Sequence, residues 1–88
     1  MPGHWKHWNM LKSNYFPDSV VRMHILEEMS LPRAWREYKG LTQAQVAEKL
    51  GISQPAMAQM ERPDANLRKK TLKKLADVLG ITFEQLTM

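Results

Sequence analysis

The feature that most constrains this chain is a repeated local pattern of a helix-capping residue, a short apolar stretch and a glycine. The pattern is clearest where Thr42 is followed by Gln45 and then by Gly51, and its first part returns as Thr82 and Gln85. A Thr and a Gln three residues apart form a capping box, in which each side chain satisfies a backbone N–H of the other residue. Glycine ends helices because it takes the left-handed backbone conformation at little cost. The pattern predicts short helices in series.

Helix-capping residues and helix-ending glycines or prolines divide most of the chain into expected helices. Their residue ranges are 18–29, 30–40, 42–51, 53–62, 68–79 and a short one at 82–86. Asp18, Ser30 and Ser53 stand at expected starts, where a side-chain oxygen can accept from a free backbone N–H. Apolar residues recur at helical spacing in these ranges, and no segment has the alternation of a strand. The sequence therefore predicts an all-α fold.

Composition limits the classes of protein to which the chain can belong. It has 88 residues, 43% of them apolar, and no cysteine. This length supports one small core, and the missing thiols exclude disulfides and thiolate metal sites. No apolar run approaches the roughly 20 residues that cross a bilayer, and the first residues lack an apolar secretory signal. We expect a cytoplasmic protein with no membrane contact. The chain is expected to consist of an irregular arm over residues 1–17, a helix over 18–29 and a helical domain over 30–88.

Positive charge is concentrated in the second half of the chain. The net charge is +4, yet basic and acidic residues balance over residues 1–29, so the excess lies in residues 30–88. Six cations cluster around the single carboxylate Asp64, namely Arg62, Arg68, Lys69, Lys70, Lys73 and Lys74. A local basic surface favours a polyanionic partner such as nucleic acid, and the alternative is a solvated helix face.

The segment Gly51-Ile52-Ser53 joins two of the expected helices through a tight turn. Small residues at Ala47 and Ala56 allow those helices to approach closely. This is the geometry of a helix-turn-helix, whose second helix fits the major groove while the first meets the DNA backbone. Two short helices and a glycine are weak support on their own, because many helical bundles contain them.

The residues themselves strengthen this interpretation. The run GLTQAQVAEKLGISQPAMAQMER, followed by TLKKLADVLGITFEQL, closely resembles the lambda-repressor-like, or Cro/XRE-type, helix-turn-helix family over about residues 30–86. The resemblance implies a five-helix domain preceded here by an extra helix or arm, operator DNA as ligand, a homodimer on a two-fold site, and no enzymatic activity, cofactor or metal.

The same resemblance assigns roles to polar residues of the two helices. Gln43, with Thr42 beside it, corresponds to the residue that holds a phosphate and braces its neighbour. Gln54 corresponds to a base-reading glutamine, and an amide can pair with both N6 and N7 of adenine. Gln59 matches a second base-facing position, which we expect one turn further along the same face. Ala58 presents a methyl group that can meet a thymine methyl.

The resemblance also bears on the cations, on one ion pair and on Pro55. Arg62, Arg68, Lys69 and Lys70 correspond to the loop region that meets the sugar-phosphate backbone, whereas Lys73 and Lys74 are expected in solvent. Arg36 and Glu61 match a structural ion pair that ties the first helix to the end of the recognition helix. Pro55 departs from the polar residue common at its position, which puts a base contact there in doubt.

A second resemblance concerns the start of the chain. The segment FPDSVVRMHILEEMSLPRAWREYKGLTQ is similar to antitoxins of bacterial toxin-antitoxin pairs, in which a helix-turn-helix domain follows a toxin-binding segment and represses its own operon. This resemblance implies a toxin partner bound through residues 1–29. A phage or host repressor without a toxin is the competing interpretation. Phe83, Leu86 and Met88 are candidates for a dimer surface, although the core also needs such side chains.

One alternative belongs to another class. Some domains of this fold serve only protein interaction or dimerisation, and such a module has no need for glutamines beside a basic loop. The arm GHWKHW holds His4 and His7, but two histidines without a third ligand nearby make a weak metal site. The aromatic residues of the arm are expected to cover an apolar patch or to meet a protein partner.

Overall fold

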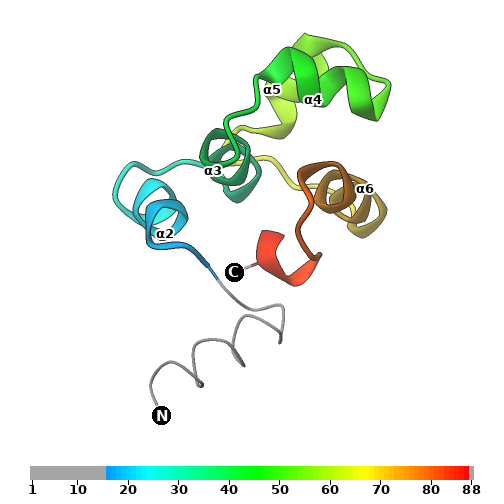
Figure 1. The fold of residues 1–88 in the computed structure, drawn as a ribbon. Helices are drawn as coiled ribbons and strands as arrows, with labels where there is room; N and C mark the ends of the chain where they lie inside the picture. The colour runs from blue at the N-terminus through cyan, green and yellow to red at the C-terminus, as the bar shows by residue number, and fades with distance from the viewer. Residues whose placement is uncertain (1–15, 88) are drawn as a thin grey trace.

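The computed structural model describes residues 16–87, and within that part of the chain it contains helices and no strand. The elements are α2 (Asp18–Ile25), α3 (Leu31–Tyr38), α4 (Gln43–Leu50), α5 (Gln54–Met60), α6 (Lys69–Leu79) and the 3₁₀-helix η1 (Glu84–Leu86). In Figure 1, α3 lies between α2 and α6, while α4 and α5 pack together at one end of the molecule. The expected all-α fold is confirmed.

Three of the helix starts follow from side chains at the N-cap. The Ser30 hydroxyl accepts from a backbone N–H three residues on, at 3.3 Å, and Ser53 does the same at 3.2 Å. Thr42 accepts from the Gln45 N–H at 3.1 Å, and the Gln45 side chain accepts from the Thr42 N–H at 2.8 Å. Gly51 closes α4 in the left-handed conformation at φ 72°. The first capping box and its glycine stop are therefore confirmed.

The expected helix over 18–29 is wrong in its length, because α2 ends at Ile25. The Met29 N–H bonds back to the Met23 carbonyl at 3.0 Å, and Glu28 between them takes a left-handed φ of 56°. This reversal lets the chain reach the start of α3. Asp18 does not cap the helix either; its carboxylate pairs with Arg22 at 3.2 Å.

The end of α2 leaves apolar side chains uncovered. Ile25 is 60% exposed and Leu26 is 75% exposed, so they contribute little to the core of the described residues. Residues 1–15, which make up most of the expected arm, lie outside the described part of the chain.

The hydrophobic core includes Trp35 of α3 and side chains from every helix of the described residues. Its buried members are Val20, Leu31, Ala34, Trp35, Val46, Ala47, Met57, Leu75, Ala76, Leu79 and Leu86. The indole N–H of Trp35 donates to the Gln85 carbonyl at 2.7 Å, which ties the C-terminal segment to α3. Leu86 is only 5% exposed, so it is core and unavailable to the expected dimer surface, of which Met88 lies outside the described residues.

Candidate nucleic-acid interface

The turn between α4 and α5 brings these helices into contact through small and flexible side chains. Gly51 allows the reversal, and the Ile52 N–H bonds to the Ala47 carbonyl at 3.0 Å. Ala47 and Met57 are almost completely buried, at 2% and 0% exposure. The local arrangement is that of a helix-turn-helix, with α5 as its second helix. Because the inner side of α5 is anchored in this way, its other side is presented to solvent.

The solvent side of α5 carries four side chains, which are those of Gln54, Pro55, Ala58 and Gln59. Successive residues of a helix are rotated by about 100°, so Gln54 and Gln59 point about 140° apart, with Ala58 and Pro55 between them. The expectation that the two glutamines share one face is therefore wrong. They form the two edges of a strip, called the recognition strip below, whose middle is apolar.

The C-terminal end of α5 is held by Glu61, whose side chain is 2% exposed. Its carboxylate accepts from Arg36 Nε at 2.5 Å and from Arg36 Nη2 at 3.1 Å. The backbone carbonyl of Glu61 accepts from the Ser30 hydroxyl at 2.7 Å, and Arg36 Nη1 donates to the Leu41 carbonyl at 2.8 Å. These bonds fix the end of α5 to α3. A buried pair of this kind orients the helices more than it stabilises them, because desolvation offsets much of the attraction.

Gln43 lies at the first position of α4 and contacts the same carboxylate. Its amide nitrogen donates to Glu61 Oε1 at 3.0 Å, and its side chain is partly buried. The start of α4 and the end of α5 are thus joined at a second point besides the turn. The amide keeps its oxygen and a second N–H, and the exposed Thr42 hydroxyl lies next to it in the sequence.

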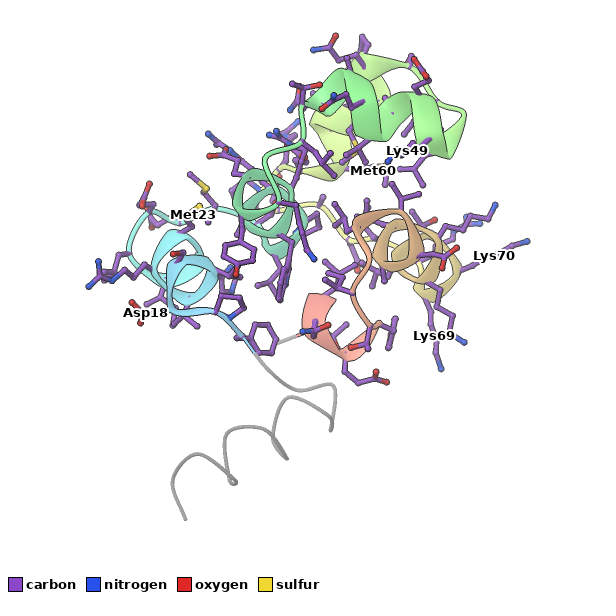
Figure 2. All side chains as sticks on the ribbon, viewed as in Figure 1. Asp18, Met23, Lys49, Met60, Lys69 and Lys70 are labelled. Atoms are coloured by element: carbon purple, nitrogen blue, oxygen red, sulfur yellow. The ribbon has the colours of Figure 1, made fainter. Side chains whose placement is uncertain are left out.

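Two of the basic residues after α5, Lys69 and Lys70, point in different directions. Arg62 is exposed and pairs with Asp64 at 3.3 Å. Lys69 places its ammonium 5.7 Å from the centre of the Phe83 ring, whereas Lys70 leaves α6 in a different direction, as Figure 2 shows. Arg68 is the exposed N-cap residue of α6. The contact with Phe83 directs the Lys69 side chain toward the C-terminal segment.

One cation beside this region was missed by sequence reasoning. Arg33 on α3 lines a surface notch of about 270 Å³ together with Arg36, Gln43, Ala58, Glu61, Arg62 and Pro63. Its Nε donates to Glu37 at 2.6 Å, and this hydrogen bond raises the pKa of the Arg33 guanidinium above its usual value. The spacing of Arg33 and Arg36 on one helix was a usable signal, because residues three apart lie on the same side.

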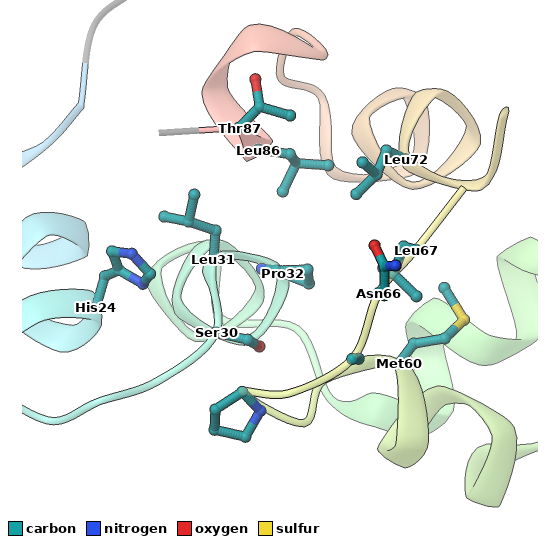
Figure 3. A pocket seen from close by; sticks show the side chains of 12 residues that line it. His24, Ser30, Leu31, Pro32, Met60, Asn66, Leu67, Leu72, Leu86 and Thr87 are labelled. Atoms are coloured by element: carbon teal, nitrogen blue, oxygen red, sulfur yellow. The ribbon is translucent and has the colours of Figure 1, made fainter. Parts of the chain in front are cut away.

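A larger hollow lies away from the recognition strip. Figure 3 shows this pocket of about 300 Å³, with Leu31, Leu67, Leu72 and Leu86 among the apolar side chains in its lining, together with His24. No group of three or more acidic or histidine side chains suited to a metal ion occurs among residues 16–87, and His4 and His7 lie outside them. Over the same residues, no helix is both long and apolar enough to cross a membrane.

Comparisons with known proteins agree with this geometry. A family model described as helix-turn-helix matches residues 33–86, which is more than half of the chain and runs from α3 to η1. A search of curated proteins and a search of solved structures each found no significant match. The match contains every residue of the recognition strip and the Arg36, Gln43 and Glu61 contacts, and it leaves α2 outside.

Proposed function

The chain belongs to the helix-turn-helix family, and from this premise we propose that it binds double-stranded DNA sequence-specifically by placing α5 in the major groove. The observation that carries the proposal is the recognition strip, whose four exposed side chains stand on a helix that is held at its end by buried contacts. The bonds from Arg36 and Gln43 to Glu61 fix that helix before any DNA arrives. Fixing the helix in advance reduces the ordering cost of binding.

The chemistry of the strip suits base edges. The amides of Gln54 and Gln59 can each pair with N6 and N7 of an adenine, and the Ala58 methyl group can contact a thymine methyl. Pro55 has no polar group and adds a second apolar surface in the middle of the strip. A DNA site with one A·T pair opposite Gln54 and another opposite Gln59 therefore suits the recognition strip. Both glutamines are exposed, so neither has to break a buried contact.

Backbone contacts come from the residues around the strip. Gln43 and Thr42 at the start of α4, with Arg62, Arg68 and Lys70 beyond α5, hold phosphates. Such contacts supply affinity and orientation but no sequence information. Lys69 contributes only if it leaves Phe83, so we rank it last among these cations.

Homodimeric binding is supported by the size of α5. The helix has 7 residues, so it is about 10 Å long and spans only a few base pairs. One copy therefore reads one half-site, and a second copy one helical turn away supplies the rest of the specificity. The protein acts as a repressor by occupying such an operator.

An autoregulating antitoxin is the more specific form of this proposal. Exposed Ile25 and Leu26 at the end of α2 support a protein partner, because two large neighbouring apolar side chains that are uncovered favour association. A toxin encoded next to this gene is the partner that the resemblance implies. A module of this fold that binds only protein has no use for the exposed glutamines of the strip.

The test is nuclease protection of the DNA upstream of the protein's own gene, at low salt, with the full chain. We expect two protected half-sites about one helical turn apart. A folded Gln54→Ala/Gln59→Ala variant should lose the preference for this DNA over an unrelated duplex. Absence of protection by the folded wild-type chain contradicts DNA binding. Repeating the experiment with the neighbouring gene product tests the antitoxin role, since an unchanged footprint and no complex exclude it.

A further inference from the structure

The notch beside the recognition strip has the composition of an anion site. It lies where α3, the start of α4 and the end of α5 meet, and Ala58 belongs both to its lining and to the strip. A ligand in the notch therefore adjoins a base-facing surface. The carboxylate of Glu61 in its wall is paired with Arg36. The guanidinium groups of Arg33 and Arg62 are paired with Glu37 and Asp64, and each keeps N–H donors that its carboxylate partner does not occupy.

The Arg33 guanidinium has N–H groups that are not used in its contact with Glu37. A guanidinium carries five N–H groups, and the contact with Glu37 uses the one on Nε. Among residues 16–87 the Arg33 side chain donates to no other acceptor. Exposed ion pairs between residues four apart in a helix contribute little to stability, so Arg33 can keep or release Glu37 at small cost. With the contact in place, the Arg33 side chain lines the notch.

We propose that this notch is a phosphate-binding site in which Arg33 donates a two-pronged hydrogen bond to a DNA phosphate beside Gln43. The inference rests on the proposed DNA binding and adds a contact from α3, a helix outside the helix-turn-helix. A planar guanidinium matches two phosphate oxygens, whereas a lysine ammonium does not. The contact fixes how deeply α5 enters the groove, because α3 and α5 are joined through Arg36 and Glu61.

The chain offers a matched control. Arg22 on α2 is exposed and pairs with Asp18 four residues away, at 3.2 Å, just as Arg33 pairs with Glu37 at 2.6 Å. Arg22 lines no part of the notch, and α2 lies at the opposite end of the molecule from α4 and α5 in Figure 1. Arg22→Ala and Arg33→Ala therefore remove the same charge and the same kind of ion pair from different places.

The experiment measures the dissociation constant of the full chain on one duplex between 50 and 200 mM salt. Arg33→Ala should weaken binding roughly tenfold on specific and unrelated duplexes alike, and lower the slope of log affinity against log salt by about 0.9, the value for one phosphate. Arg33→Lys should restore the slope but only part of the affinity. Arg22→Ala should leave both close to the wild type, and thermal unfolding should show that all three variants fold.

The two proposals fail in different ways. If the wild type binds DNA and Arg33→Ala behaves like Arg22→Ala, the phosphate site is overturned and DNA binding stands. If the folded wild type binds no duplex at 50 mM salt, both proposals are overturned. A loss confined to one sequence after Arg33→Ala also contradicts the site, because a phosphate contact carries no sequence information.

Discussion

The side-chain amide of Gln43 donates to the carboxylate of Glu61 at 3.0 Å, across 18 residues of sequence and between the two helices of the helix-turn-helix. The same carboxylate accepts from Arg36, 25 residues away on α3. Three helices therefore meet at one buried charge. Gln43, for which we propose a phosphate contact, is thus connected to the end of α5, the helix that we propose reads the bases.

Glu61→Ala should lower both stability and DNA affinity. The substitution leaves the buried Arg36 guanidinium with only the more distant Glu37 carboxylate, 3.8 Å from its Nη2, as a counter-charge. Losing the buried partner costs about 3 kcal/mol in the free energy of unfolding. It also frees the end of α5, so the variant should bind its operator more weakly even at a temperature at which it is folded. Urea unfolding and equilibrium DNA binding measure the two effects.

Glu48→Ala is the control for Glu61→Ala, because Glu48 is an exposed carboxylate on α4. It should change the free energy of unfolding by less than about 0.5 kcal/mol. Unchanged DNA binding by a folded Glu61→Ala variant would mean that the ion pair does not position α5. An Arg36→Met/Glu61→Met variant should recover much of the stability, since an apolar pair replaces the buried charges.

Gln43→Ala should reduce stability by about 1.5 kcal/mol, because it removes a hydrogen bond to a charged group. It should also weaken binding to every duplex, since it removes a phosphate contact. Gln45→Ala is its partner variant on the same helix; it breaks the capping box, costs about 1 kcal/mol and leaves DNA affinity unchanged. Equal losses of affinity in the two variants would assign the effect of Gln43 to folding alone.

Gln54→Ala and Lys70→Ala should separate base reading from backbone contact. Losing the amide should relax sequence preference by roughly 1 to 3 kcal/mol at one position, while losing the lysine should weaken all sequences alike and flatten the salt dependence. Competition binding with a library of single-substitution operators measures both. A sequence-independent loss in Gln54→Ala would remove this residue from the recognition strip.

Gly51→Ala should destabilise the protein by about 1 kcal/mol through the backbone alone. The glycine has φ 72°, and a Cβ built there meets nothing within 4 Å, so the cost is that of a left-handed alanine. Gly51→Asn should cost less, because asparagine tolerates this conformation better. Thermal unfolding compares the two, and a larger loss in the asparagine variant would contradict a purely conformational cause.

Much of the fold could be predicted because the signals are local. Three helices begin at N-cap residues whose side chains bond to an N–H three residues on, namely Ser30, Thr42 and Ser53. The helix end at Gly51 likewise depends on backbone atoms three to five residues apart. Such local signals act in the same way in any helix. The end of α2 could not be predicted in this way. The helix ends at Ile25 because the chain reverses at Glu28 and so brings Ser30 to the N-cap position of α3. The residue types at positions 26–29 do not indicate such a reversal.

The sequence by itself determined which residues start and end most helices, which side chains are apolar, and that glutamines and cations occur near the turn. Only the tertiary structure decided which of them meet. It brought Gln43, Arg36 and Glu61 to one buried point, placed Arg33 beside them and turned Lys69 toward Phe83. The bonds of Gln43 and Arg36 to Glu61 span 18 and 25 residues of sequence. The place of Arg33 beside them depends on how α3 packs against α4 and α5. Helical periodicity sets the face of one helix, whereas partners across helices follow from how the whole core packs.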